Sequence, residues 1–277
     1  MISWGKPHQG DLVITSTKPD FDALLAQAHA LANRASSVIL PRFRAGVGIA
    51  HKGGSDFDPV TEADKEAERV MRALINERFP DHGIIGEEFG SENEDAEYCW
   101  VLDPIDGTRA FIMGQPLWGV LIGLAKDGAP YVGMMEQPFL GERFWAADGK
   151  AIYRRGETEK LMRTRACADL ADALLGATGP YMFEEWELAR FDELGANVRL
   201  KRYGGDCYNY CLLAMGEVDL VVEASLNIYD ILPLIPIVEA AGGVVTTWEG
   251  GDPAQGGRII AAGDPALHEK ALRYLNP

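Results

Sequence analysis

The spacing of apolar residues changes near residue 80, and this change limits the chain to folds that combine helices with sheets. Residues 20–42 and 62–79 carry apolar side chains with the period of an amphipathic helix. From residue 82 onward the apolar runs are short and end at turn residues, which is the pattern of strands. We therefore predict two helices followed by a sheet in the first half of the chain.

The strands of this first sheet are expected to include an antiparallel hairpin. Residues 117–125 and 130–137 are two apolar runs, and Asp127-Gly128 between them is a strong hairpin signal. Further strands are expected at residues 82–87, 99–102 and 143–147.

The second half of the chain alternates strands with helices. Strands are expected at residues 173–177, 198–202, 219–223, 243–247 and 258–261, and helices at residues 184–194, 207–215, 231–241 and 265–275. This order predicts stacked layers of helices and sheets, the α/β (α+β) class. In the helix at 231–241, Pro233 fits a first turn, whereas Pro236 should kink the helix.

Length and composition favour one large folded unit. The chain has 277 residues, 47% of them apolar, which is enough to bury a substantial core. We predict a single domain over residues 19–277, made of two halves at about 19–150 and about 151–277. Residues 1–18 are predicted to be an N-terminal extension.

The charge of the chain excludes several classes of partner. Its 42 acidic and 26 basic residues give a net charge of −16, so a binder of nucleic acid or a polybasic membrane-surface protein is not expected. The N-terminus lacks the pattern of a secretory signal, and the apolar window 229–248 contains charges and prolines unlike a membrane span. The 4 cysteines lack CxxC spacing. We therefore predict a reduced, cytoplasmic setting.

Three separate segments place carboxylates where a strand or loop meets a turn. They are residues 86–88 (Gly-Glu-Glu), residues 103–108 (Asp-Pro-Ile-Asp-Gly-Thr) and residues 229–230 (Tyr-Asp). Hard cations such as Mg²⁺ take oxygen ligands, and a site with several ions needs carboxylates from different parts of the fold. A turn at Pro104-Ile105 would aim Asp103, Asp106 and the Ile105 carbonyl at one point. The backbone N–H groups that follow suit a phosphate.

Each segment taken alone has an ordinary structural explanation. Thr61 and Asp64 could be a helix capping box, with Thr61 as the N-cap, and Glu87 could be a surface charge. Residues 103–108 could be a simple turn. No nucleophilic alternative competes, because the 5 histidines are scattered and no G-x-S-x-G string is present. The ordered set of carboxylates is what favours a metal site.

Together these segments resemble the Mg²⁺-dependent inositol monophosphatase family. The resemblance covers about residues 20–275 and rests on residues 58–64 (DPVTEAD), 86–88 (GEE), 103–108 (DPIDGT), 229–230 (YD) and 239–243 (EAAGG). It implies a layered αβαβα sandwich of the sugar-phosphatase type. It also implies a homodimer and a small-molecule phosphate monoester as substrate.

The resemblance also implies a role for individual residues. The implied metal ligands for two or three Mg²⁺ ions are Glu87, Asp103, the Ile105 carbonyl, Asp106 and Asp230. Asp64 resembles the further acidic position that holds the water or a weaker third metal, and Thr108 resembles the residue that orients the attacking water. The amides of Gly107 and Thr108 are the implied phosphate site. Such a mechanism suits phosphomonoester hydrolysis, because bound cations reverse the local field of an acidic protein.

Two features resemble the histidinol-phosphatase branch of the family. Asp206 stands where inositol phosphatases have small residues, and Tyr229 replaces their usual Trp before Asp230. Carboxylates at Asp206 and Glu223 could pair with the ammonium and imidazole of histidinol phosphate, although Asp206 could instead cap the following helix.

We therefore expect a Mg²⁺-dependent hydrolase of L-histidinol phosphate that works through a metal-activated water. The alternatives are an inositol-1-phosphate phosphatase, a broad sugar or nucleotide phosphatase, and a catalytically idle metal-binding module. The last alternative is disfavoured because all the implied ligands and Thr108 are present.

Overall fold

The computed structural model describes residues 20–45, 50–51, 59–60 and 62–276. The predicted N-terminal extension at 1–18 and the predicted N-cap Thr61 lie outside the described residues. Within the described ranges, no helix has the length and apolar character that crossing a membrane requires.

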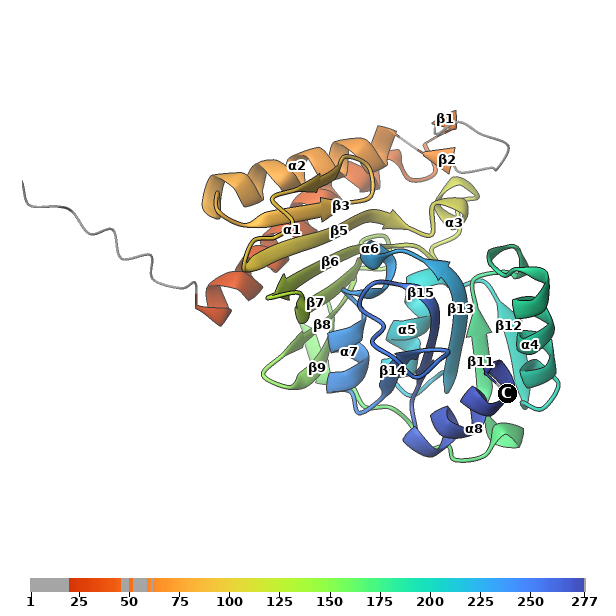
Figure 1. Ribbon diagram of the computed structural model, residues 1–277. Helices are drawn as coiled ribbons and strands as arrows, with labels where there is room; N and C mark the ends of the chain where they lie inside the picture. Colours follow the sequence, from red (N-terminus) through yellow and green to blue (C-terminus); the bar gives the residue numbers. More distant parts are fainter. Residues whose placement is uncertain (1–19, 46–49, 52–58, 61, 277) are drawn as a thin grey trace, which may run out of the picture.

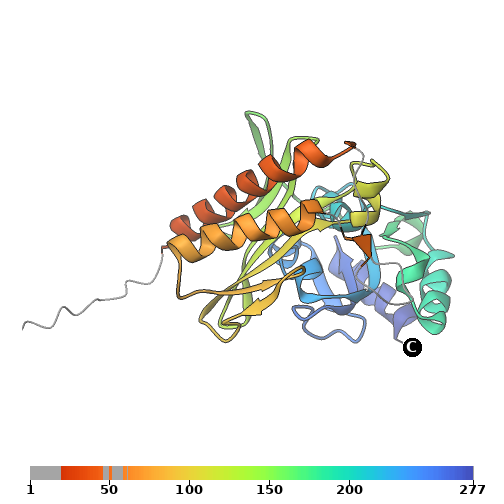
Figure 2. The ribbon, with the colours of Figure 1, turned by 90° about the horizontal axis from the view of Figure 1, so that it is seen from above.

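The helices α1 (Phe21–Ile39) and α2 (Glu62–Arg78) lie side by side over one face of the first sheet, as Figures 1 and 2 show. The apolar stripe of each helix faces inward, and Leu24, Leu31 and Met71 are wholly buried in the core that the helices share with the sheet. The predicted helix pair is confirmed. The short helix η1 (Leu40–Arg42) extends α1.

The first sheet has eight strands in the order β10-β9-β8-β7-β6-β5-β3-β4. Their bounds are β3 (Gly83–Gly86), β4 (Gly90–Glu92), β5 (Tyr98–Asp106), β6 (Gly119–Lys126), β7 (Ala129–Gln137), β8 (Glu142–Ala147), β9 (Lys150–Arg155) and β10 (Thr158–Leu161). The hairpin between β6 and β7 is confirmed, and both Asp127 and Gly128 adopt the positive φ that this tight turn needs. The short strands β1 (Ala50–His51) and β2 (Pro59–Val60) pair separately.

The second sheet has five strands in the order β12-β11-β13-β15-β14. Their bounds are β11 (Leu174–Ala177), β12 (Leu200–Tyr203), β13 (Leu220–Leu226), β14 (Val244–Thr247) and β15 (Gly257–Ala262). The strand β11 is parallel to β12 and β13, whereas β15 is antiparallel to both of its neighbours.

The remaining helices lie at the end of β5 (α3), between the sheets, or around the second sheet (Figure 1). Their bounds are α3 (Thr108–Ile112), η2 (Leu170–Asp172), η3 (Pro180–Met182), α4 (Glu185–Gly195), α5 (Asp206–Ala214), α6 (Ile228–Ile231), α7 (Ile235–Ala240) and α8 (Pro265–Leu275). The helices α5 and α7 pack between the sheets, and α4 and α8 cover the outer face of the second sheet. The predicted αβαβα sandwich of the α+β class is confirmed.

The single helix predicted at 231–241 is wrong, because the chain forms two short helices there. Pro233 lies in the turn between α6 and α7, and Pro236 lies in the first turn of α7, where its missing N–H breaks no helical hydrogen bond. This turn packs closely on the first sheet: a Cβ added at Gly133 would lie 2.2 Å from the Pro233 carbonyl oxygen. Instead of the expected kink at Pro236, the helix is interrupted completely by the turn before that residue.

Candidate metal centre

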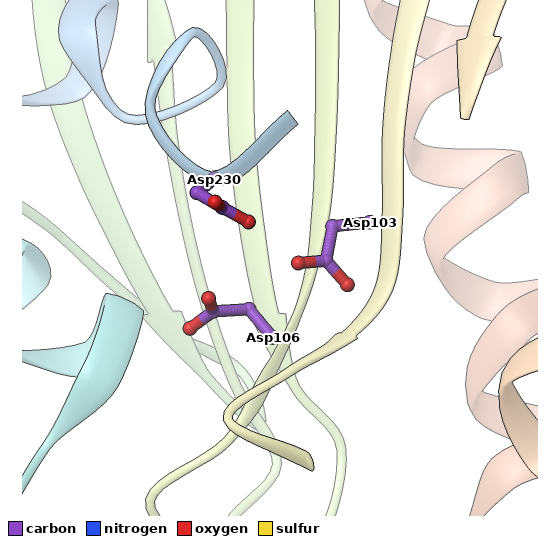
Figure 3. A group of neighbouring side chains, drawn as sticks. All are labelled: Asp103, Asp106 and Asp230. Carbon is purple, nitrogen blue, oxygen red and sulfur yellow. The ribbon is translucent and has the colours of Figure 1, made fainter. Parts of the chain in front are cut away.

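Three aspartates from two distant parts of the chain meet at one point between the sheets. Carboxylate oxygens of Asp103, Asp106 and Asp230 all lie within 4.8 Å of one another. Asp103 and Asp106 come from β5 and Asp230 comes from α6, and Figure 3 shows the three side chains gathered at one place. The first and second halves of the sequence therefore both contribute to this cluster.

A bulge in β5 places Asp103 and Asp106 on the same side of the strand. Asp103 pairs with Leu121 and Asp106 pairs with Gly119, so β5 has one residue more than its partner over this stretch. In a regular strand, side chains three positions apart would point to opposite faces. The predicted turn at Pro104-Ile105 is therefore wrong, since these residues lie within the strand and the bulge produces the convergence.

Glu87 reaches the cluster through parallel pairing of β3 with β5. Gly86 is the register partner of Leu102, and the Glu87 N–H donates to the Leu102 carbonyl with N and O 3.2 Å apart. Because Gly86 lies beside Leu102 and the two strands run parallel, the next residues along each strand, Glu87 and Asp103, also lie beside each other. The two carboxyl groups are close enough to share a hydrogen bond.

Burial and mutual repulsion raise the pKa values of these aspartates. Burial raises the pKa of Asp103 well above its ordinary value, and the charges of Glu87, Asp106 and Asp230 raise it further. Burial, followed by the charge of Asp206, raises the pKa of Asp106 to about 8, against the effect of the Cys207 N–H, which donates to its Oδ2 at 2.7 Å. The pKa of Asp230 is raised by burial and then by Asp106. A divalent cation would relieve this repulsion, so the all-oxygen donor set fits Mg²⁺.

The residues after Asp106 form the tight connection to α3. Gly107 is the N-cap of α3 with φ of 83°, and a Cβ there would lie 2.9 Å from the Leu117 carbonyl oxygen. The Thr108 hydroxyl donates to the Ile105 carbonyl oxygen at 3.1 Å. Thr108 thus contacts the same carbonyl that the sequence suggested as a metal ligand.

Asp64, the further acidic position that the resemblance implied, is buried in the first turn of α2.

Asp206 and Glu223 lie beside the aspartate cluster. Asp206 is the first residue of α5, and its N-cap is Gly205, so Asp206 does not cap this helix. Burial, followed by the charge of Glu223, raises the pKa of Asp206 to about 7. Glu223 is buried in β13 and accepts hydrogen bonds from the Thr178 N–H at 2.8 Å, the Thr178 hydroxyl at 2.6 Å and the Tyr210 hydroxyl at 2.9 Å.

Sequence reasoning missed a cation–π contact next to this acidic pair. The Arg109 guanidinium carbon lies 4.2 Å from the ring centre of Tyr181, in η3 of the second half. Residue Tyr181 is 57% exposed, yet the pKa of its hydroxyl is raised by partial burial and then by the charge of Asp206. Arg109 follows Thr108 directly, which is the only sequence signal for it. No pattern in the sequence points to its partner.

Three side chains of types that can bind metal or act as nucleophiles, His82, Cys207 and Cys211, lie in packed surroundings. His82 stacks on the rings of Phe79 and Tyr98 and accepts a hydrogen bond from the Trp100 indole N–H at 3.1 Å. Cys207 and Cys211 are buried in the core between the two sheets. These environments are typical of packed core residues.

Comparison with known proteins matches residues 20–277 to the family model described as the inositol monophosphatase family. The chain is 40% identical to the bifunctional phosphatase IMPL2, chloroplastic, of Arabidopsis thaliana over 92% of this chain and 76% of that protein. It is 35% identical to a histidinol-phosphatase of Mycobacterium tuberculosis, covering 91% of this chain and 97% of that one. A solved inositol monophosphatase from Zymomonas mobilis superposes with a TM-score of 0.83 at 41% identity, over 94% of this chain and 100% of that one.

Proposed function

The chain belongs to the inositol monophosphatase family, and from this premise we propose that it is a Mg²⁺-dependent phosphatase that hydrolyses L-histidinol phosphate. Membership of this phosphatase family supports a phosphomonoester hydrolase. The observation that carries the finer proposal is the pair of acids, Asp206 and Glu223, beside the aspartate cluster. An acidic pair at this place suits a leaving group with positive charge.

The aspartate cluster is the proposed place for the metal ions. Asp103, Asp106 and Asp230, together with Glu87, would hold two of them. We propose the Ile105 carbonyl as a further ligand, and Asp64, buried at the start of α2, for a weaker third ion. Bound Mg²⁺ supplies a water with a lowered pKa and stabilises the charge of the leaving oxygen. The chain's own carboxylates contribute by holding these positions before substrate arrives.

Thr108, Gly107 and their neighbours are proposed to handle the phosphate and the attacking water. The Thr108 hydroxyl already donates to the Ile105 carbonyl, so its oxygen is oriented to accept a hydrogen bond from a water at the metal centre. The N–H groups of Gly107 and Thr108 precede or begin α3, and we propose that they bind the phosphate oxygens. These groups would orient the water and the phosphorus atom in line.

Asp206 and Glu223 are proposed to bind the leaving group. The ammonium of L-histidinol phosphate would favour the ionised form of Asp206, whose pKa of about 7 lies near neutral pH. Glu223 accepts three hydrogen bonds, so its carboxylate is held in place and adds negative charge near Asp206. Inositol 1-phosphate offers only hydroxyl groups to the same pair.

The experiment that tests this proposal measures phosphate release from L-histidinol phosphate and from inositol 1-phosphate, with Mg²⁺ and with a chelator. We expect faster release from L-histidinol phosphate and no release under chelation. The alternative, an inositol-1-phosphate phosphatase, is favoured by the likeness to the Zymomonas mobilis structure. Release from inositol 1-phosphate alone would support that alternative. The predicted homodimer and cytoplasmic setting remain predictions.

A further inference from the structure

Glu68 is a fully buried acid that binds the turn carrying Glu87. Its side chain projects from α2 and is 0% exposed. One carboxylate oxygen, Oε2, accepts the Glu88 N–H at 2.7 Å, and the other, Oε1, accepts the Phe89 N–H at 3.2 Å. The two backbone amides that directly follow Glu87 are therefore both bound by one side chain of a neighbouring helix.

Arg72 completes this attachment one helical turn later. Its Nε donates to Glu68 Oε1 at 2.7 Å, and its Nη1 donates to Glu92 at 2.9 Å. Its Nη2 donates to the carbonyl of Gly90, at the other end of the turn. Because Arg72 is also buried, the network neutralises Glu68 and attaches the turn at residues 87–89 and strand β4 to α2.

Gly86 is the residue that makes this close approach possible. A Cβ added at Gly86 would lie 2.1 Å from Glu68 Oε1 and 2.5 Å from its carboxyl carbon. Any larger residue would therefore push Glu68 away from the turn. The close approach of Glu68 from α2 therefore explains why a glycine precedes Glu87.

We propose that Glu68, supported by Arg72, is a positioning residue that aims the Glu87 carboxylate at Asp103 for metal binding. The inference rests on the metal centre of the proposed function. Glu87 is fixed on its N-terminal side by pairing of β3 with β5 and on its C-terminal side by Glu68. Residues that orient a metal ligand typically change metal affinity about 10- to 100-fold when they are mutated.

A buried acid elsewhere provides a matched control. Asp219 is also 0% exposed, pairs with Arg165 and accepts a backbone N–H, that of Leu174, at 2.8 Å. It precedes β13, and no hydrogen bond in the described part of the chain links it to the aspartate cluster. Replacing either acid by its amide keeps the shape and removes the charge. A general loss of stability would therefore appear in both variants.

The test compares Glu68→Gln and Asp219→Asn with the wild type. Mg²⁺ alone is titrated, and binding is followed by the rise in melting temperature; phosphate release from p-nitrophenyl phosphate is measured at each Mg²⁺ concentration. We expect Glu68→Gln to raise the Mg²⁺ concentration needed for half-saturation about 10- to 100-fold, with much of the turnover restored by excess Mg²⁺. Asp219→Asn should lower the melting temperature without changing the Mg²⁺ midpoint.

An unchanged Mg²⁺ midpoint in folded Glu68→Gln, or an equal rise in Asp219→Asn, would overturn the inference. If Glu68→Gln does not fold, Arg72→Lys takes its place as the test variant. This substitution keeps a positive charge beside Glu68 but loses the several simultaneous hydrogen bonds of the guanidinium. It should raise the Mg²⁺ concentration for half-saturation severalfold, and no rise would refute the inference. Wild-type protein that shows no response to Mg²⁺ would contradict the proposed metal centre, and the inference with it.

Discussion

The backbone N–H of Cys207 donates a hydrogen bond to Oδ2 of Asp106, with 2.7 Å between the two atoms and 101 positions between them in the sequence. Asp106 belongs to the first sheet and Cys207 to the first turn of α5, so this contact joins the two halves at the aspartate cluster. Asp230 approaches the same point from α6. The cluster is therefore complete only when the two halves are packed against each other.

Replacing Asp106 by Asn should separate metal binding from folding. The amide oxygen can still accept the Cys207 N–H, but the charge that disfavours the folded state without metal is removed. We expect the metal-free variant to melt higher than the metal-free wild type at about pH 8, and phosphate release to fall at least about 100-fold. Asp148→Asn, at an exposed turn, is the control and should change neither quantity. Mg²⁺-dependent stabilisation that survives in Asp106→Asn would contradict this prediction.

The stability of the metal-free protein should fall as pH rises from about 4 to about 8. The pKa of Asp106 is raised from 3.8 to about 8, and that of Asp206 to about 7. Within this window the folded protein retains protons that the unfolded chain releases, so each step up in pH favours unfolding. Below the ordinary pKa of 3.8 both states are protonated and these groups contribute nothing.

Mg²⁺ should therefore stabilise the protein more at the high end of this window, where the carboxylates no longer hold protons in competition with the cation. Melting temperatures in chelator and in Mg²⁺, measured at about pH 5 and about pH 8, test this dependence. If the difference between the melting temperatures in Mg²⁺ and in chelator were the same at both pH values, the aspartates would not be the groups that bind the ion.

Asp206→Asn should weaken the use of L-histidinol phosphate selectively. A hydrogen bond to a charged group contributes about 1.5–3 kcal/mol, so we expect kcat/KM to fall about 10- to 100-fold for this substrate. The effect on p-nitrophenyl phosphate should be much smaller, because its leaving group carries no cation. Asp206 suits this test better than Glu223, whose three hydrogen bonds also hold β13 to its surroundings. Equal losses on both substrates would remove Asp206 from the leaving-group site.

Apolar periodicity predicted most of the fold, since the helices at residues 20–42 and 62–79 and the Asp127-Gly128 hairpin carry strong local patterns. It missed β9 and β10 at the edge of the first sheet, where many side chains face solvent and the apolar signal is weak. The break before α7 depends on how Pro233 packs against Gly133, which is a tertiary contact.

Local sequence patterns predicted less of the candidate site than of the fold. The spacing of Asp103 and Asp106 suggested a turn, whereas their convergence depends on a bulge that only the pairing with β6 reveals. Glu68 resembles a surface charge on an amphipathic helix, because its partners Glu88 and Phe89 lie 20 and 21 positions later. Arg109 and Tyr181 meet only when the two halves pack together. Contacts between distant segments leave no periodic pattern in the sequence from which they could be predicted.

The most direct test of the central claim is a competition in one reaction, with L-histidinol phosphate and inositol 1-phosphate at equal concentrations and Mg²⁺ present. The ratio of the two initial rates gives the ratio of the kcat/KM values for the two substrates. We predict a ratio well above one in favour of L-histidinol phosphate, which falls toward one in Asp206→Asn. A ratio below one in the wild type would contradict the account.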